Sequence, residues 1–91
     1  METNTLSLRR SKLQISVEVL SAISQGEQKP TRLMYTCNLS WNSVKDTLDI
    51  LVDRGFVDEM FENEKRRRYS VTAKGRDVIR YYAGLQELVQ V

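Results

Sequence analysis

The chain has 91 residues, 41% hydrophobic and 29% charged, which suffices for one small domain with a single core. It has a formal net charge of +2, no histidine and one cysteine, Cys37. These counts argue against zinc and most transition-metal sites, and they exclude an intrachain disulfide and the Ser–His and Cys–His nucleophile pairs. We therefore expect a single domain over residues 1–91 that is not an enzyme and holds no metal or cofactor.

Hydropathy and cysteine content also bear on the cellular compartment. No apolar run approaches about 18 residues, and the first ten residues lack the apolar stretch of a signal peptide. A lone cysteine is typical of proteins from reducing compartments. The sequence therefore predicts a cytoplasmic protein without a membrane span.

The first helix is predicted to start at Ser11 and to end before Gly26. Ser11 and Gln14 form a capping-box pattern, and Gly26 suits the position that ends a helix. Apolar residues repeat with the period of a helix that is buried on more than one side, namely Ile15, Val17, Val19, Leu20, Ala22 and Ile23.

A short second helix follows, with Pro30 at its first position, where the missing N–H group costs nothing. Leu33, Met34 and Cys37 supply an apolar stripe about one turn long, so Cys37 is expected to be a buried thiol rather than a redox sensor. The segment 38–40 breaks the helix. Two helices joined by so tight a break form a helix-turn-helix.

The third helix is predicted to begin after Ser40, which suits the N-cap, and to end at Gly55. Leu39 and Val44 have the spacing of a hydrophobic staple, which fixes the angle at which the chain enters the helix. The inward positions are Val44, Leu48, Leu51 and Val52, and the outward positions are Trp41, Asn42, Lys45, Asp46 and Asp49.

The hydrophobic period changes from that of a helix to that of a strand after Gly55. Val57 and Phe61 fall on one face of a first strand within residues 56–62. A second strand follows, with its tip at residues 63–65, so the two segments predict a β-hairpin with a basic tip. The alternating residues of the second strand are Arg67, Tyr69 and Val71.

This order of elements is that of a winged helix, an α+β, mostly helical fold. Residues 10–72 would form the helix-turn-helix and the wing, and residues 73–91 a C-terminal helix. The segments "RSKLQI", "KPTRLMYTCNLS", "LDILVDRGFV" and "YSVTAKG" resemble the small archaeal winged-helix DNA-binding proteins. That family includes chromatin-associated proteins and proposed transcriptional regulators.

The resemblance implies a double-stranded DNA-binding protein, a transcriptional regulator or small chromatin-associated protein located at the nucleoid. The third helix would lie in the major groove and the arginine-rich wing on the backbone or in the minor groove. A chain of this length leaves no obvious place for a small-molecule ligand. The candidate DNA contacts are Ser40, Trp41, Asn42, Ser43, Lys45, Lys65, Arg66, Arg67 and Arg68.

Two of these contacts also have purely structural interpretations. Trp41 could stack on DNA, or it could pack between the second and third helices. Arg66 could form an ordinary cross-strand ion pair with Glu62. Lys65 and the three arginines nevertheless exceed what two nearby glutamates neutralise, which favours contact with phosphates.

A second class of function stays open, a winged helix that binds another protein and not DNA. Asp46 and Asp49 favour it, because acids on a groove-facing helix repel phosphates. Asp46 stands where many winged-helix regulators carry a base, and it could instead lie to one side or help to select cytosine. The N-terminal bases could extend a DNA-binding surface or simply be solvated, and they are Arg9, Arg10 and Lys12.

The C-terminal helix is predicted to begin after Thr72, an N-cap residue. Its near half, with Val78 and Tyr82, would pack on the first helix, whereas the apolar residues beyond have no such cover. We therefore expect a homodimer through this helix, and the alternative is a frayed end in a monomer. The expected interface residues are Tyr81, Leu85, Leu88 and Val89.

Overall fold

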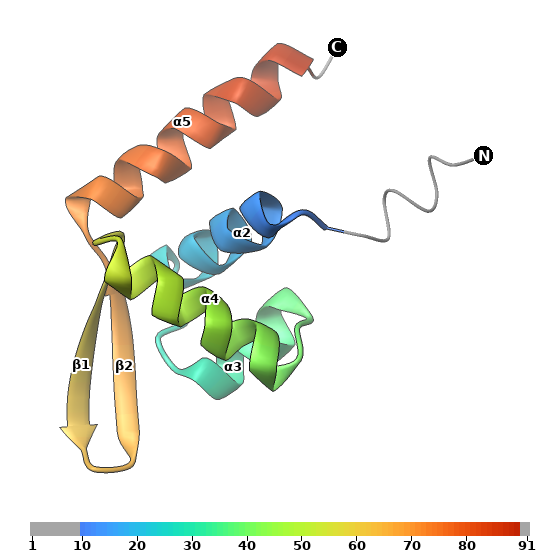
Figure 1. The fold of residues 1–91 in the computed structure, drawn as a ribbon. Helices are drawn as coiled ribbons and strands as arrows, with labels where there is room; N and C mark the ends of the chain where they lie inside the picture. Colours follow the sequence, from blue (N-terminus) through green and yellow to red (C-terminus); the bar gives the residue numbers. More distant parts are fainter. Residues whose placement is uncertain (1–9, 90–91) are drawn as a thin grey trace.

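The computed structural model describes residues 10–89. In chain order the elements are α2 (Lys12–Ser24), α3 (Pro30–Cys37), α4 (Trp41–Asp53), β1 (Val57–Asn63), β2 (Arg66–Val71) and α5 (Ala73–Val89). Figure 1 shows α2, α3 and α4 as one helical body, from which the two strands project as a hairpin and beside which α5 runs past α2. The prediction of an α+β, mostly helical winged helix is confirmed.

Hydrogen bonds at the helix starts follow the predicted caps. Ser11 Oγ accepts from the Gln14 N–H, and Gln14 Oε1 accepts from the Ser11 N–H, both at 3.0 Å, which completes the capping box of α2. Ser40 Oγ accepts from the Ser43 N–H at 3.1 Å at the start of α4. Thr72 Oγ1 accepts from the N–H three residues on at 3.0 Å at the start of α5. Each cap satisfies a backbone donor that the helix cannot.

The turn between α3 and α4 depends on Asn38. This residue lies in the left-handed region at φ 54°, a conformation that asparagine tolerates better than most residues. The next residue, Leu39, donates its N–H back to the Met34 carbonyl at 2.9 Å. The chain therefore reverses within three residues and enters α4 directly.

The core lies where α2, α3, α4 and the base of the hairpin meet. It contains most of the residues expected from the helical periods, and Val44 and Leu33 are fully buried. Three of the expected residues are only partly buried and pack against the core, namely Ile15, Met34 and Val52. Thr47 is also buried on α4, although its polar side chain gave no such indication. The other buried core residues include Val19, Leu20, Ala22, Ile23, Cys37, Leu48, Leu51, Val57, Tyr69 and Val71.

The hairpin is antiparallel and irregular near its tip. Val57 pairs with Val71 at its base, and the register shifts between Phe61 and Asn63. The predicted tip of residues 63–65 is one residue too long, because Asn63 is the last residue of β1. Its side-chain oxygen accepts from two backbone N–H groups of the turn, at 2.9 and 3.0 Å, which orders the tip.

No helix within residues 10–89 is long and apolar enough to cross a membrane. The predicted C-terminal helix runs to Val89, and its last two predicted residues lie outside the described part of the chain.

Candidate nucleic-acid interface

The first turn of α4 presents the side chains that the sequence assigned to it. Asn42 and Lys45 are exposed, as is Ser40, whose hydroxyl oxygen is occupied by the N-cap bond, and Ser43 is half-buried. Trp41 is 46% exposed. A tryptophan with so much accessible surface offers an aromatic face to a ligand while its remaining surface packs on the protein.

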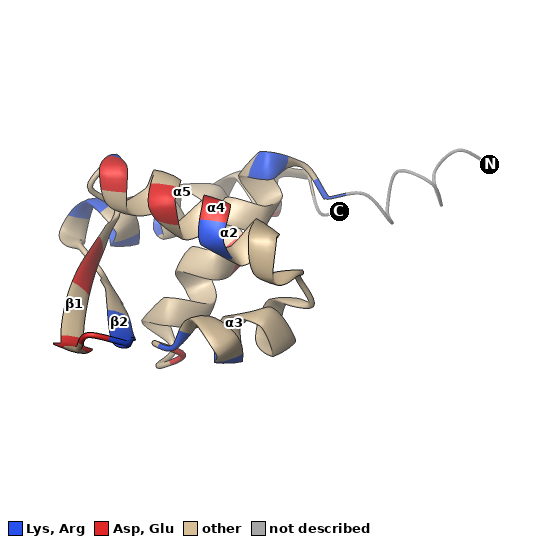
Figure 2. Ribbon diagram, turned by 60° about the horizontal axis from the view of Figure 1, so that its bottom comes forward, with Lys and Arg blue, Asp and Glu red and all other residues tan. Residues whose placement is uncertain are grey.

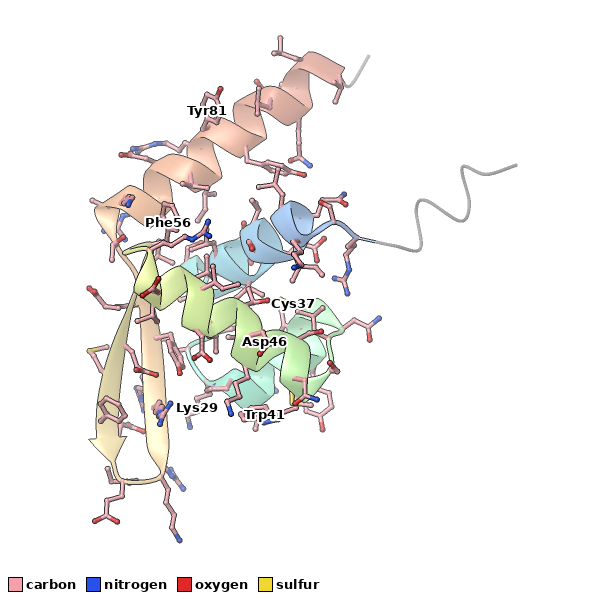
Figure 3. All side chains as sticks on the ribbon, in the orientation of Figure 1. Lys29, Cys37, Trp41, Asp46, Phe56 and Tyr81 are labelled. Carbon is pink, nitrogen blue, oxygen red and sulfur yellow. The ribbon has the colours of Figure 1, made fainter. Side chains whose placement is uncertain are left out.

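A groove of about 630 Å³ separates α4 from the wing. It brings together five basic and three acidic side chains from α4, the hairpin and the segment that enters α3. Figure 3 shows Lys29 and Trp41 at the same lower end of the helical body, beside the wing. The lining residues are Lys29, Pro30, Thr31, Trp41, Lys45, Leu48, Asp49, Glu62, Glu64, Lys65, Arg66, Arg67 and Tyr69.

Two of the polar groove residues that were absent from the sequence-based site lie at the start of α3. Lys29 and Thr31 flank Pro30 at the start of α3, and the fold carries them to the wall opposite the wing. The only signal in the sequence was a lysine directly before an N-terminal helix proline. That pattern marks a helix start, but it does not say which groove the helix start will face.

The wing arginines differ in whether a carboxylate of the protein pairs with them. Arg67 Nη1 lies 3.4 Å from Glu59 Oε2, and its guanidinium lies 5.1 Å from the centre of the Phe61 ring. Arg68 Nε lies 2.7 Å from Glu62 Oε2. The interpretation of Glu62 as the partner of Arg66 is therefore wrong, because the shifted register places Glu62 beside Arg68.

Lys65 and Arg66 remain as the unoccupied bases of the wing. Neither side chain forms an ion pair within residues 10–89, and both are exposed at the tip. Both line the groove, as does Arg67, whereas Arg68 does not. An unpaired, exposed base is the type of residue that phosphate oxygens attract.

Acidic residues lie among the basic residues of this surface. Figure 2 shows red and blue segments following one another along α4 and at the wing tip. Asp49 lines the groove together with Lys45, whereas Asp46 is exposed on α4 but does not line it. Asp46 therefore lies to one side of the groove, as one of the sequence-based alternatives held.

Tyr69 joins the wing to the helical body. Its N–H donates to the Gln28 carbonyl at 3.1 Å, next to the start of α3. Its hydroxyl donates to Glu59 Oε2 at 2.7 Å. Burial, reinforced by the hydrogen bond to the Glu59 carboxylate, raises the pKa of Tyr69 to about 12. The main-chain bond of Tyr69 thus holds the wing beside the start of α3, and its side-chain bond joins β2 to β1 within the wing.

Arg10 does not extend the basic surface, contrary to one expectation from the sequence. Its guanidinium donates to the Cys37 and Asn38 carbonyls and pairs with Glu18, so the protein itself occupies it. Lys12 is exposed, and Arg9 lies outside the described residues. Cys37 is buried as predicted, and burial raises the pKa of its thiol.

The far half of α5 is exposed, as expected from the sequence. Val78 packs against the core and Tyr82 is half-buried, so the near half of the helix covers the domain. Tyr81 points away from the helical body (Figure 3). The exposed fractions are 72% for Tyr81, 42% for Leu85, 78% for Leu88 and 77% for Val89.

Residues 9–90 match the sequence model of a family described as winged helix-turn-helix. The chain is 30% identical over 83 residues to the uncharacterized protein MJ0287 of Methanocaldococcus jannaschii. The aligned segment covers 91% of this chain and 77% of that protein. It is 32% identical over 69 residues to the uncharacterized protein MJ0290 of the same archaeon. The aligned segment covers 76% of this chain and 30% of that protein.

Solved bacterial regulators share the fold. BpsR of Bordetella bronchiseptica, whose DNA binding is regulated by 6-hydroxynicotinic acid, has a TM-score of 0.75 at 13% identity over 81% of this chain and 58% of its own. A MarR-family regulator of Silicibacter pomeroyi has a TM-score of 0.69 at 18% identity over 88% of this chain and 54% of its own. A mutant MarR of E. coli, complexed with operator DNA, has a TM-score of 0.66 at 19% identity over 72% of this chain and 49% of its own. The chain thus spans about half the length of these regulators, and likeness at such identities shows the fold alone.

Proposed function

The chain belongs to the winged helix-turn-helix family, and from this premise we propose that it binds double-stranded DNA as a transcriptional regulator or small chromatin-associated protein at the nucleoid. In this proposal α4 enters the major groove, and the wing lies on the backbone or in the minor groove. The observation that carries it is the groove between α4 and the wing, where five basic side chains from three parts of the chain lie together.

Base reading is assigned to the first turn of α4. Asn42 is exposed there and has the donor and acceptor geometry to pair with adenine, and Lys45 can reach a guanine or a phosphate. Trp41 would stack on a sugar or a thymine methyl group. Ser40 and Ser43 would contact the backbone through hydroxyl groups near the helix N-terminus, where the helix dipole favours phosphate.

Phosphate binding is assigned to the two walls of the groove. Lys65 and Arg66 would bind on the wing side, and Lys29 and Thr31 on the α3 side. Arg67 and Arg68 would contribute less, because each already lies beside a glutamate. A partner charge at this distance must be displaced or shared before the arginine can bind a phosphate.

A salt-dependent titration with random and genomic duplex DNA tests the proposal. Each phosphate contact contributes about 0.9 to the slope of log K against log salt for duplex DNA. The three phosphate-binding bases, Lys29, Lys65 and Arg66, therefore predict a slope of about −2.7 for each protomer, and the uncharged Thr31 adds nothing to it. A protein that fails to bind either duplex at low salt, where nonspecific electrostatic binding is strongest, would contradict DNA binding outright.

A protein-interaction module is the second candidate function, and the outer face of α4 favours it. Asp46, Asp49 and Asp53 are exposed along this helix, and Ile50 is exposed beside them. Such a face would suit a basic protein partner better than a phosphate backbone. A protein that binds no duplex DNA even at low salt would favour this candidate over the first.

We further propose that the protein is a homodimer through the far half of α5. The four apolar residues exposed there are Tyr81, Leu85, Leu88 and Val89. A second copy of the same helix would cover them in a symmetric interface. Two copies would present two α4 helices and two wings, so the DNA site would be palindromic, with half-sites one helical turn or a multiple of it apart.

A further inference from the structure

We propose that Arg10 is a positioning residue, which fixes the turn between α3 and α4 and thereby the direction in which α4 presents its first turn. The proposal rests on the DNA-binding function proposed above. It gives Arg10, which directly precedes the N-cap of α2, a role in recognition without a contact to DNA.

Three hydrogen-bonding partners converge on the Arg10 guanidinium. Nη1 donates to the Cys37 carbonyl at 2.7 Å, and Nη2 donates to the Asn38 carbonyl at 2.9 Å. Nη1 also lies 2.5 Å from Glu18 Oε1, one of the carboxylate oxygens of α2. The side chain is only 28% exposed. One residue thus connects the start of α2, its middle and the end of α3.

The two carbonyls that accept from Arg10 lie at the C-terminal end of α3, where they lack partners within the helix. The last carbonyls of a helix have no partner within the helix, and α3 is only eight residues long. A cation at a helix C-terminus also interacts favourably with the helix dipole. Arginine suits the position better than lysine, because its planar fork donates to two acceptors at once. The guanidinium therefore stabilises both the end of α3 and the left-handed Asn38 that follows it.

The turn controls the direction of the recognition residues. α4 begins at Trp41, three residues after Asn38, so a change in the turn moves Trp41 and Asn42 first. Base contacts require placement within about 0.5 Å, whereas phosphate contacts by flexible lysines and arginines do not. Loss of the Arg10 contacts should therefore reduce discrimination between base sequences more than it reduces affinity for random DNA.

The experiment compares Arg10→Gln and Arg10→Lys with Lys12→Ala, an exposed base two residues away that serves as the control. Each variant is titrated with a duplex selected by the parent protein from a random library, and with a random duplex of equal length. Amide hydrogen exchange is measured without DNA at Asn38 and Leu39, whose N–H groups are hydrogen-bonded in the turn, and at Leu20 in the core.

The expected result has three parts. In Arg10→Gln, exchange at Asn38 and Leu39 accelerates about tenfold while exchange at Leu20 is unchanged, because only the turn opens. The preference for the selected duplex falls about tenfold, which corresponds to the loss of one good base contact. The salt slope stays within about 0.3 of the parent value, because no phosphate contact is removed. Arg10→Lys gives values between those of the parent and of Arg10→Gln, and Lys12→Ala matches the parent in exchange and in preference for the selected duplex.

Two results for Arg10→Gln would overturn the proposal. A salt slope lower by about 0.9 in Arg10→Gln would make Arg10 a direct phosphate contact. Unchanged exchange at Asn38 and Leu39 would show that the turn does not depend on it. A parent protein that binds no DNA would refute the proposed function and this inference with it, whereas a parent that binds with sequence preference, together with an unaltered Arg10→Gln, would refute only the inference.

Discussion

Glu62 lies beside Arg68 and not beside Arg66, because the register of the wing shifts between Phe61 and Asn63. Four consecutive bases therefore do not form one uniform patch. Arg68 is off the groove and has a carboxylate 2.7 Å away, whereas Arg66 faces the groove and has no ion-pair partner within residues 10–89. This difference should separate the two arginines in a DNA-binding assay.

The first prediction concerns the wing. Alanine at Arg66, Arg67 and Arg68 together should weaken binding to all duplexes similarly and flatten the salt dependence. The single alanine variants should differ in how much of this loss each one causes. Arg66→Ala should reduce the salt slope by about 0.9, and Arg68→Ala, the matched control, should reduce it by much less. A triple variant that binds as well as the parent at equal salt would make the wing a solvated loop.

The second prediction distinguishes base contacts from phosphate contacts on α4. Asn42→Ala should relax the preference at one or two base positions by about 1–3 kcal/mol and leave affinity for random DNA nearly intact. Lys45→Ala should weaken binding to all sequences if Lys45 meets a phosphate. Parallel selections from a random library measure both effects. Equal loss on every duplex would make Asn42 a positioning contact, and no loss at all would favour an architectural role on DNA or the protein-interaction module.

Elements of this fold that depend on neighbouring residues could be predicted from the sequence. The capping box of Ser11 and Gln14, the N-cap at Ser40 and the stop at Gly26 each involve residues within a few positions of one another. The helical period identified the core in the same way, since burial on a helix repeats along the chain. These local signals were sufficient to predict the order of the helices and strands.

The contacts that define the site join residues far apart in the chain, and the sequence did not reveal them. Arg10 meets Cys37 and Asn38 across 27 and 28 positions. Lys29 lines the same groove as the wing residues, and the Tyr69 N–H donates to the carbonyl of its neighbour, Gln28. The pairing of the wing glutamates depends on a one-residue irregularity in the register, which alternation of hydrophobic residues does not encode.

The third prediction uses two glycines of α5 that differ in their surroundings. A Cβ atom on Gly75 would clash with the Phe56 carbonyl and come within 2.7 Å of Val71 Cγ1, whereas one on Gly84 would meet nothing within 4 Å. Gly75→Ala should therefore lower the free energy of unfolding by about 1–3 kcal/mol, despite the higher helix propensity of alanine. Gly84→Ala should raise it by about 0.5–1 kcal/mol. Urea denaturation measures both, and a stabilising Gly75→Ala would show that α5 does not pack this closely on the hairpin.

The fourth prediction concerns alkaline pH. The pKa of Tyr69 is raised to about 12 in the folded protein, so the folded state favours the protonated phenol. Its stabilising contribution is fully present below the unfolded pKa of about 10 and is lost as pH rises toward 12, a loss of roughly 2–3 kcal/mol. Tyr69→Phe should not show this loss, and Tyr35→Phe, at an exposed position, should retain it. Denaturation at a series of pH values gives the difference in the free energy of unfolding between each variant and the parent. The contribution of lysine ionisation is common to both and cancels in this difference. Parallel curves for the parent and Tyr69→Phe would contradict the assignment.

The last prediction is the dimer. α5 has 17 residues and is about 26 Å long, so its far half has little of this small domain left to cover. Burying a side chain such as Leu85 or Leu88 stabilises an interface by about 1.5–3 kcal/mol. Two heptads with Gly84 among them make a weak coiled coil, so the association should be sensitive to one substitution.

Leu88→Glu should dissociate that dimer, because it would place two carboxylates in one apolar seam. Tyr35→Glu is the matched control, since Tyr35 is an equally exposed apolar residue on α3, and it should leave the mass unchanged. Sedimentation equilibrium at micromolar concentration should give about twice 10.6 kDa for the parent and for Tyr35→Glu, and 10.6 kDa for Leu88→Glu. A parent mass of 10.6 kDa would leave a monomer with an exposed helix end, and the palindromic site expected for a dimer would then have no basis.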